Sequence, residues 1–375
     1  MRADVFCRVI DNFGDIGVTW RLARQLTSEF RWEIRLWVDN LQAFAKIEPR
    51  LDPGAATQSL AGVNIRRWPQ AHEEPDVEPA TLVIAAFSCE PPPGFLQRMR
   101  ASPTVLVNLE YLSAETWVEG CHALPALRAD GLNAHYFFPG FTARTGGLPR
   151  EAALARNRED WIVNRAGQRS LLARAGLSEH GMHLWDAQKG AKLVTLFCYP
   201  HAPVAALIDS LVALQRPTLL LVAGGTLPSL KTQTRGELRI ERIEFLTQPD
   251  YDRLLWMADL NFVRGEDSIV RAIWAGKPAA WQLYPQADAA HLAKLEAWLA
   301  IAGLPPTAQA AIRGWNATPE PVEAVKSALE EALVPANFAA WSKATERFRQ
   351  TQTQIPDLAG ALDLFCRKKL ESLAT

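Results

Sequence analysis

Cysteine is scarce in this 375-residue chain, and the signals of secretion and membrane insertion are missing. The five cysteines are scattered and form no C-x-x-C pair. An odd, unpatterned set is typical of a reducing compartment and argues against a disulfide framework. No stretch approaches the roughly 20 uninterrupted apolar residues of a membrane helix, and the N-terminal residues include Asp4 and lack an apolar signal-peptide core. We therefore expect a cytoplasmic protein with no membrane partner.

Net charge is also lacking, because 40 Lys and Arg residues are balanced by 41 Asp and Glu, giving −1. This balance removes the usual electrostatic reason to expect a nucleic-acid partner. The motifs G-x-G-x-x-G, G-x-x-x-x-G-K-[ST], H-E-x-x-H and G-x-S-x-G are absent. Dinucleotide oxidoreductases, P-loop enzymes, zinc proteases and α/β-hydrolases thus have no motif support. No D-x-D motif with a matching metal role is evident, and we expect neither a metal nor a cofactor.

What the sequence does contain is a series of short apolar runs that alternate with helical patterns. Continuous apolar runs of this length predict strands buried on both faces of a parallel sheet. The length and the 48% apolar content suit two or three folded domains. The expected strands cover residues 3–10, 33–38, 81–87, 104–112, 192–199, 218–225, 238–245, 260–265 and 278–285.

The spacing of these runs predicts an α/β protein with two Rossmann-like domains. We expect a first domain over residues 1–165 and a second over residues 180–335. Residues 336–375 are expected to form helices that pack back towards the N-terminal domain. Two such domains facing each other would place the carboxyl ends of both sheets around one cleft, where ligands of open α/β sheets bind.

The first candidate site follows the first apolar run, in the segment DNFGDIG. It places the carboxylates of Asp11 and Asp15 four residues apart, and Gly14 allows the backbone to approach a ligand. One interpretation makes Asp15 the N-cap of a helix beginning at Ile16, with Asp11 as an ordinary turn residue. The other makes the two carboxylates catalytic. Local sequence favours the first, although one residue can serve both purposes.

The second candidate site is the segment RGEDS at residues 264–268, where an expected strand ends and a helix begins. A helix N-terminus beside a cation such as Arg264 is suited to a phosphate group. Glu266 and Asp267 would repel a bare anion, so we expect them to accept hydrogen bonds from sugar hydroxyls. The alternative is an ordinary capped helix, with Asp267 or Ser268 as its cap and Arg264 neutralising its acidic neighbours.

The third candidate site is aromatic. Alternation places Phe197 and Tyr199 on one face at the end of an expected strand, and Phe245 ends another. Together they predict a stacking platform for a nucleobase. For any single aromatic residue, packing in the core is the better interpretation.

Taken together, these features indicate the layout of a GT-B glycosyltransferase, and the sequence resembles one particular family of them. The family is the bacterial protein-arginine rhamnosyltransferases that modify elongation factor P, the EarP family. The resemblance covers essentially the whole chain and is strongest in residues 11–26, 196–201 and 261–286. It implies a two-domain GT-B fold, with an acceptor and catalytic domain over residues 1–165 and a nucleotide-sugar-binding domain over residues 180–335. It also implies dTDP-L-rhamnose as donor, inversion at the anomeric carbon and an arginine side chain of elongation factor P as acceptor.

The resemblance also implies roles for individual residues. Asp15 matches the catalytic carboxylate, and Asp11 a second essential acid in the same turn. Residues expected to bind the donor are Asn12, Phe13, Gly14, Phe197, Tyr199, Phe245, Gln248, Arg264, Glu266, Asp267 and Ser268. We hypothesise that Asp15 accepts the proton of the reacting guanidinium nitrogen while Asp11 orients the group or the loop.

Two alternatives stay open at this point. One is a GT-B enzyme that uses another nucleotide sugar on a small-molecule or lipid acceptor. The other is a noncatalytic protein that senses a nucleotide, against which the presence of both Asp11 and Asp15 argues.

Overall fold

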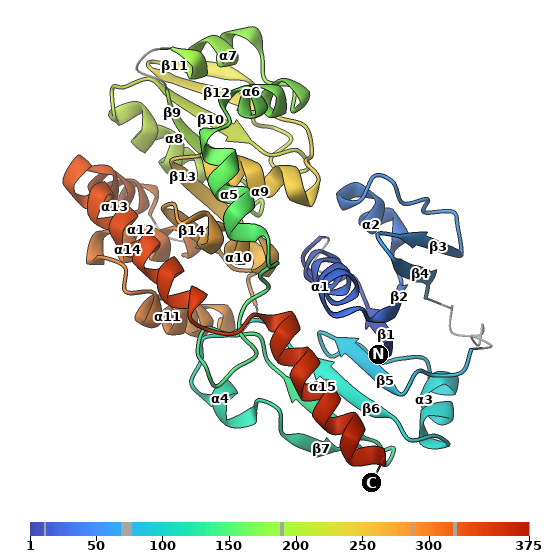
Figure 1. Cartoon of the computed structure of the whole chain (residues 1–375). Coiled ribbons are helices and arrows are strands. Elements are labelled where there is room, and N and C mark those ends of the chain that lie inside the picture. The colour runs from blue at the N-terminus through green and yellow to red at the C-terminus, as the bar shows by residue number, and fades with distance from the viewer. Residues whose placement is uncertain (11–12, 69–76, 188–190, 287, 318–320, 375) are drawn as a thin grey trace. The chain divides into compact units, whose positions relative to one another are not determined.

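The computed structural model describes residues 1–10, 13–68, 77–187, 191–286, 288–317 and 321–374. The chain divides into two compact units (Figure 1). The first comprises Met1–Ala152 and Gln352–Thr375, and the second comprises Ala153–Thr351. These bounds differ from the expected ones: residues 153–165 belong to the second unit, and the C-terminal helical region is shared between both.

The first unit is an α/β fold built on one sheet. Its helices are α1 (Gly14–Phe30), α2 (Leu41–Ile47), α3 (Pro93–Arg100), α4 (Trp117–Cys121) and α15 (Leu358–Ala374). Its strands are β1 (Arg2–Cys7), β2 (Glu33–Val38), β3 (Thr57–Leu60), β4 (Val63–Arg67), β5 (Leu82–Ala86), β6 (Val105–Leu109), β7 (Pro125–Leu127) and β8 (Asn133–Phe137).

The strand order of this sheet contains a reversal of direction. Among the described residues the order is β3-β4-β2-β1-β5-β6-β8-β7, parallel except for the β3–β4 and β7–β8 pairs. From β1 the chain moves outward through β2, then returns to β5 on the other side of β1. Ligands of open α/β sheets bind at such a reversal, beyond the carboxyl ends of the strands. In this unit, the reversal lies between β1 and β5.

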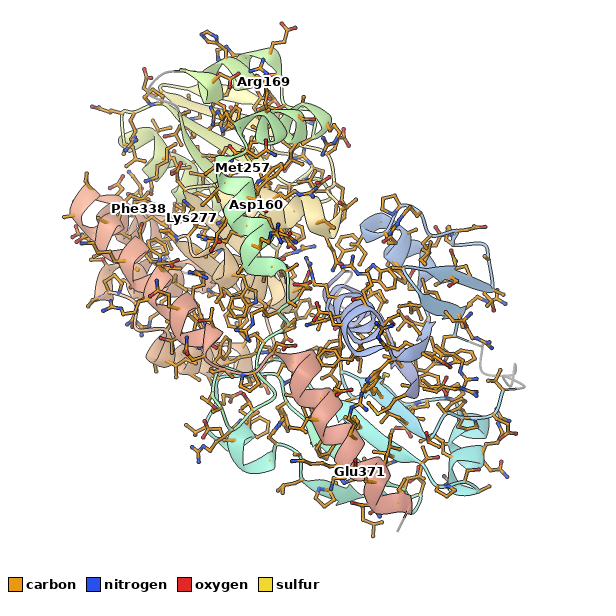
Figure 2. All side chains as sticks on the ribbon, viewed as in Figure 1. Asp160, Arg169, Met257, Lys277, Phe338 and Glu371 are labelled. Atoms are coloured by element: carbon orange, nitrogen blue, oxygen red, sulfur yellow. The ribbon has the colours of Figure 1, made fainter. Side chains whose placement is uncertain are left out.

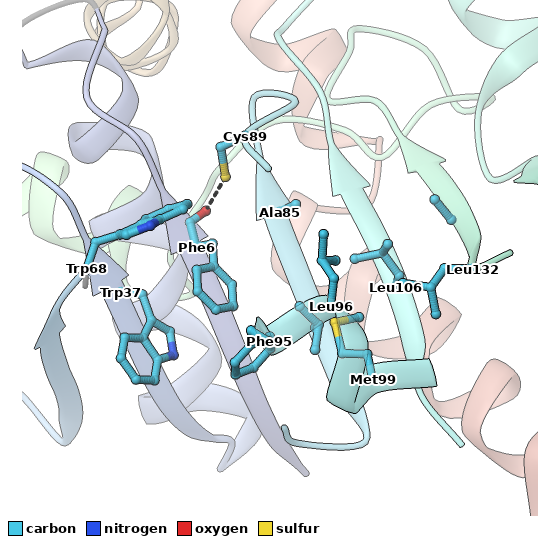
Figure 3. Close-up of a cluster of buried hydrophobic side chains, with 12 residues drawn as sticks. Phe6, Trp37, Trp68, Ala85, Cys89, Phe95, Leu96, Met99, Leu106 and Leu132 are labelled. Atoms are coloured by element: carbon cyan, nitrogen blue, oxygen red, sulfur yellow. Dashed lines mark hydrogen bonds between the residues drawn. The ribbon is translucent and has the colours of Figure 1, made fainter. Parts of the chain in front are cut away.

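Aromatic side chains fill the core on one face of the first sheet (Figure 3). Phe6 of β1 stacks on Trp37 with ring centroids 5.7 Å apart and meets the edge of Phe95 of α3 at 4.8 Å. The Cys89 thiol donates to the carbonyl of Phe6 at 3.2 Å. Burial of each large aromatic side chain stabilises the fold by roughly 2–3 kcal/mol, so this face anchors α3 on the sheet.

Helix α15 packs on α1 and on β6, although more than 300 residues separate it from α1 (Figure 1). The indole of Trp32 donates to Asp363 at 2.7 Å, and the amide of Gln25 donates to Asp357 at 3.0 Å. The backbone just before this helix, at Pro356, packs against Gly147, which has a φ of +73°. A side chain there would lie 2.0 Å from the carbonyl oxygen of Pro356, so only glycine allows the approach.

The second unit is also an α/β fold. Its strands are β9 (Lys192–Leu196), β10 (Thr218–Val222), β11 (Gln233–Arg235), β12 (Leu238–Arg242), β13 (Leu260–Arg264) and β14 (Ala279–Gln282). Its helices are α5 (Leu154–Val163), α6 (Arg165–Arg174), α7 (Glu179–Asp186), α8 (Val204–Ala213), α9 (Gln248–Met257), α10 (Gly265–Ala275), α11 (Ala290–Ala302), α12 (Pro306–Asn316), α13 (Val322–Leu333) and most of α14 (Pro335–Thr353).

The described strands of this unit follow the order β11-β12-β10-β9-β13-β14. All neighbours are parallel except β11 and β12. The reversal lies between β9 and β13, so the segments after these two strands are where this domain is expected to bind a ligand.

A buried ion pair joins the two helices that begin beside this reversal. Arg271 of α10 donates to both carboxylate oxygens of Asp252 on α9, at 3.1 and 2.8 Å. Arg271 is 1% exposed and Asp252 is 4% exposed. Bidentate geometry satisfies both buried charges and fixes the two helices relative to each other.

Every expected strand overlaps an observed one, but several observed strands end earlier than the apolar runs. The first strand stops at Cys7 instead of residue 10, β6 at Leu109 instead of 112, and β9 at Leu196 instead of 199. The apolar and aromatic residues past these ends lie in loops at the carboxyl edge of each sheet. No helix among the described residues is long and apolar enough to cross a membrane.

Candidate functional site

Asp15 lies beside the reversal in the first sheet, in the first turn of α1. Its Oδ2 accepts a hydrogen bond from the backbone N–H of Ile10 at 2.8 Å. The hydroxyl of Tyr111, from the loop after β6, donates to Oδ1 at 3.4 Å. Asp15 is only 3% exposed, so its orientation is fixed by protein groups.

The expectation that Asp15 is the N-cap of a helix beginning at Ile16 is wrong. The helix begins at Gly14, because the N–H of Gly17 already donates to the carbonyl of Phe13 at 2.9 Å. Phe13 is the N-cap residue, and its side chain makes no capping hydrogen bond. Asp15 is therefore the second residue of the helix. There its negative charge interacts favourably with the positive, N-terminal end of the helix dipole.

The other residues expected in this loop have different outcomes. Phe13 and Gly14 lie in the first unit at the start of α1, with the ammonium of Lys46 5.7 Å from the centre of the Phe13 ring. Asp11 and Asn12 lie outside the described residues.

The remaining eight expected residues lie in the second unit, and Arg264 contacts two of the others. Its guanidinium lies over the rings of Phe197 and Tyr199, 4.4 and 4.7 Å from their centres. It also donates to the carbonyl of Cys198 at 3.3 Å. A guanidinium held against aromatic faces is ordered before any ligand arrives. Phe197 and Tyr199 thus hold Arg264 in this structure.

The acidic residues of the RGEDS segment have partners of their own. Glu266 pairs with Lys294 of α11 at 2.5 Å, and Asp267 accepts from the side-chain amide of Gln248 at 3.3 Å. The expected alternative of a helix capped by Asp267 or Ser268 is wrong, because α10 begins at Gly265 with Arg264 as its N-cap residue and no side-chain capping bond. Glu266 is neutralised by Lys294 and not by Arg264. With Lys294 balancing one carboxylate, the segment is less repulsive towards an anion than its sequence suggests.

Phe245 lies in the segment between β12 and α9. It is half-buried, and its backbone packs against Gly224 after β10, where a Cβ would lie 2.5 Å from the Phe245 nitrogen. Gly225, with a φ of +79°, lies below the Phe245 ring. The two glycines therefore permit the backbone and the ring of Phe245 to pack closely against the chain after β10.

Ser268 completes the group at the start of α10. It lies beside Tyr251 of α9, whose phenol has a pKa raised by burial, with the Ser268 hydroxyl acting in the opposite direction. Tyr251 also packs edge-on against Phe197, with ring centres 5.8 Å apart.

Sequence reasoning missed Tyr111, Lys294 and Tyr251. The signal for Tyr111 was present, because a Glu-Tyr pair ends an apolar run, but that run was interpreted as strand throughout. Lys294 is 28 residues from Glu266, and no local pattern connects the two. Within the described ranges, no group of three or more His, Cys, Asp or Glu side chains is placed to hold a metal ion.

The architecture defines the class of protein. MurG of Acinetobacter baumannii superposes with a TM-score of 0.54 at 11% sequence identity, covering 97% of each chain. Two Rossmann-like domains of this kind are the GT-B glycosyltransferase fold, as expected from the sequence.

Sequence comparison then gives the family. The model for the elongation factor P rhamnosyltransferase EarP matches residues 3–367. The protein-arginine rhamnosyltransferase of Pseudomonas aeruginosa is 43% identical over 96% of this chain and 98% of its own, and that of Pseudomonas putida is 41% identical over 98% and 99%. The chain belongs to the EarP family, a family of protein-arginine rhamnosyltransferases.

A solved structure agrees with this assignment. It is described as the structural basis for EarP-mediated arginine glycosylation of translation elongation factor EF-P. It matches with a TM-score of 0.65 and 30% identity, covering 98% of this chain and 99% of that one. The expected fold, family and class of enzyme are thereby confirmed.

Proposed function

We propose that this protein transfers L-rhamnose from dTDP-L-rhamnose to an arginine side chain of translation elongation factor P, with inversion at the anomeric carbon. Membership of the EarP family over residues 3–367 carries the proposal. Because the proposed acceptor is a translation factor and all five cysteines of this chain are free thiols, we assign the enzyme to the cytoplasm.

The first unit supplies the proton acceptor. Guanidinium is a poor nucleophile, since its lone pairs are delocalised and its pKa lies above about 12. Asp15 accepts the proton from the reacting nitrogen as the new N–C bond forms and the bond from the anomeric carbon to dTDP breaks. Its low exposure and its bond from Ile10 fix the accepting oxygen before the acceptor arrives. We assign Asp11 to orientation of the acceptor or its loop.

The second unit supplies the donor site. The diphosphate gains negative charge as it leaves, and Arg264 together with the backbone N–H groups at the start of α10 stabilises it. Glu266 and Asp267 accept from hydroxyl groups of the donor, with Gln248 and Ser268 beside them. We assign base stacking to Phe245, whose ring is half-buried beside Gly225.

A donor comparison tests this function. We expect dTDP release from dTDP-L-rhamnose in the presence of elongation factor P, and far slower turnover of dTDP-glucose and UDP-glucose. Phe245→Ala should weaken dTDP binding by calorimetry, since base–aromatic stacking contributes about 1–3 kcal/mol. Phe95→Ala, in the core of the first unit, is the matched control for loss of an aromatic ring. Any fall in dTDP binding by this variant should be proportional to its loss of folded protein. Preference for another donor would contradict the proposal.

A further inference from the structure

The segment after β5 has an unusual backbone conformation. A series of side-chain contacts connects this segment to Asp15. Phe87 and Ser88 have φ values of +57° and +54°, in the left-handed region that non-glycine residues rarely adopt. Two consecutive residues of this kind are costly and persist only where the surroundings hold them. Phe87 is 5% exposed and its N–H donates to the carbonyl of Leu109 at 2.6 Å.

This turn supports the loop after β6 at two adjacent points. The Phe87 ring stacks on Tyr111, with ring centres 4.7 Å apart and planes inclined by 25°. The Ser88 hydroxyl donates to Glu110 at 3.0 Å. Phe87 also packs against Val18, one turn along α1 from Asp15. The turn therefore contacts both the helix that carries Asp15 and the loop that carries Tyr111.

Helix α1 and the loop after β6 meet at the Asp15 carboxylate, where the Tyr111 hydroxyl donates to Oδ1 at 3.4 Å. The opposite oxygen accepts from Ile10. Tyr111 is 38% exposed, so burying its ring in the core does not explain its placement. Stacking on Phe87 does, because it directs the hydroxyl at the carboxylate.

We propose that Tyr111 is a positioning residue for the reaction: its hydroxyl, held by the Phe87–Ser88 turn, fixes the rotamer of Asp15 so that one carboxylate oxygen faces the acceptor nitrogen. The proposal rests on the role assigned to Asp15 under the proposed function. It goes further by naming the group that orients this carboxylate and the strained turn that holds that group.

The test compares Tyr111→Phe with Tyr136→Phe in the full-length enzyme, using dTDP-L-rhamnose and elongation factor P. Tyr136 lies on β8 of the same unit, so its variant controls for loss of a tyrosine hydroxyl. Phenylalanine keeps the stack on Phe87 and removes only the hydroxyl. We expect Tyr111→Phe to lower kcat roughly tenfold, the value of a hydrogen bond to a charged group. Its KM for both substrates and its melting temperature should match those of Tyr136→Phe.

A normal kcat for Tyr111→Phe would overturn the inference, and so would a raised KM for elongation factor P with kcat unchanged, which would make Tyr111 an acceptor contact. Asp15→Asn in the same assay keeps the two proposals distinguishable. If Asp15→Asn is active, the role of Asp15 fails. If it is inactive while Tyr111→Phe is normal, only the positioning role fails.

Discussion

Replacing Asp15 with asparagine separates its structural contribution from its chemical one. Asparagine is almost the same size and keeps one oxygen acceptor for the N–H of Ile10, now 2.8 Å from Oδ2. Its amide group can donate to the Tyr111 hydroxyl, which is able to accept as well as donate. The network therefore survives with its polarity reversed at one end.

The stability cost of this change is correspondingly small. Hydrogen bonds to a charged group contribute about 1.5–3 kcal/mol and neutral ones about 0.5–1.5 kcal/mol. Asp15→Asn weakens two such bonds, one of them long at 3.4 Å, and loses a favourable charge in the first turn of α1. We expect a loss of about 1–2 kcal/mol in the free energy of unfolding, seen as a melting temperature lower by a few degrees.

The effect on catalysis should be far larger, because the variant has no proton acceptor at this position. General-base contributions are typically about 10²–10⁴-fold in rate, so single-turnover transfer followed by intact-protein mass spectrometry should slow by that factor. Affinity for dTDP-L-rhamnose, measured by calorimetry, should stay within about twofold.

Asp39→Asn provides the matched control. Asp39 is exposed and accepts from the N–H of Val9 at 2.9 Å, one residue from Ile10. This variant removes a carboxylate with a similar local contact and should transfer rhamnose at the parental rate. If Asp15→Asn keeps more than about a tenth of the parental rate, the base must be sought elsewhere.

Three further predictions concern the second unit. Arg264→Lys should weaken dTDP binding roughly tenfold by calorimetry, because a point charge cannot replace a planar group stacked on two rings; unchanged affinity would contradict this role. Arg271→Leu should cost about 3–5 kcal/mol in urea unfolding by leaving a buried charge, whereas adding Asp252→Leu should recover much of it; a double variant as unstable as the single one would contradict a charge effect. Burial lowers the pKa of Lys192 to about 8, and its ammonium lies 3.2 Å from the centre of the Phe338 ring. Phe338 is labelled on α14 in Figure 2. Since the unfolded chain binds the proton more tightly, stability should rise with pH above about 8, and this rise, of about 1–2 kcal/mol, should be missing in Lys192→Met.

The interiors of the nine expected strands could be predicted from the sequence, and their ends could not; β3, β4, β7, β8 and β11 were not predicted. A strand buried on both faces requires a continuous apolar run, which is visible in the residues alone. At the ligand end of each sheet the next residues are also apolar or aromatic, as at Tyr111, Phe197 and Tyr199. Only the loss of backbone hydrogen bonding ends the strand there, and composition does not report it.

For the candidate site, the sequence likewise predicted several of the residues but not the contacts between them. Asp15 and the RGEDS segment stand out because carboxylates and an arginine follow apolar runs. The contacts that give them their geometry are long-range: Tyr111 reaches Asp15 across 96 positions, and Lys294 reaches Glu266 across 28. The stacking of Arg264 on Phe197 and Tyr199 likewise depends on two neighbouring strands, β13 and β9, whose pairing no local pattern reveals.

The most direct test of the central claim is to map the product. The purified enzyme is incubated with dTDP-L-rhamnose and unmodified elongation factor P, and the modified residue is located by fragmentation mass spectrometry. We predict one deoxyhexose on a single arginine, with inverted anomeric configuration by NMR. Sugar on a lysine or serine, or an unmodified factor while another acceptor is consumed, would contradict the account.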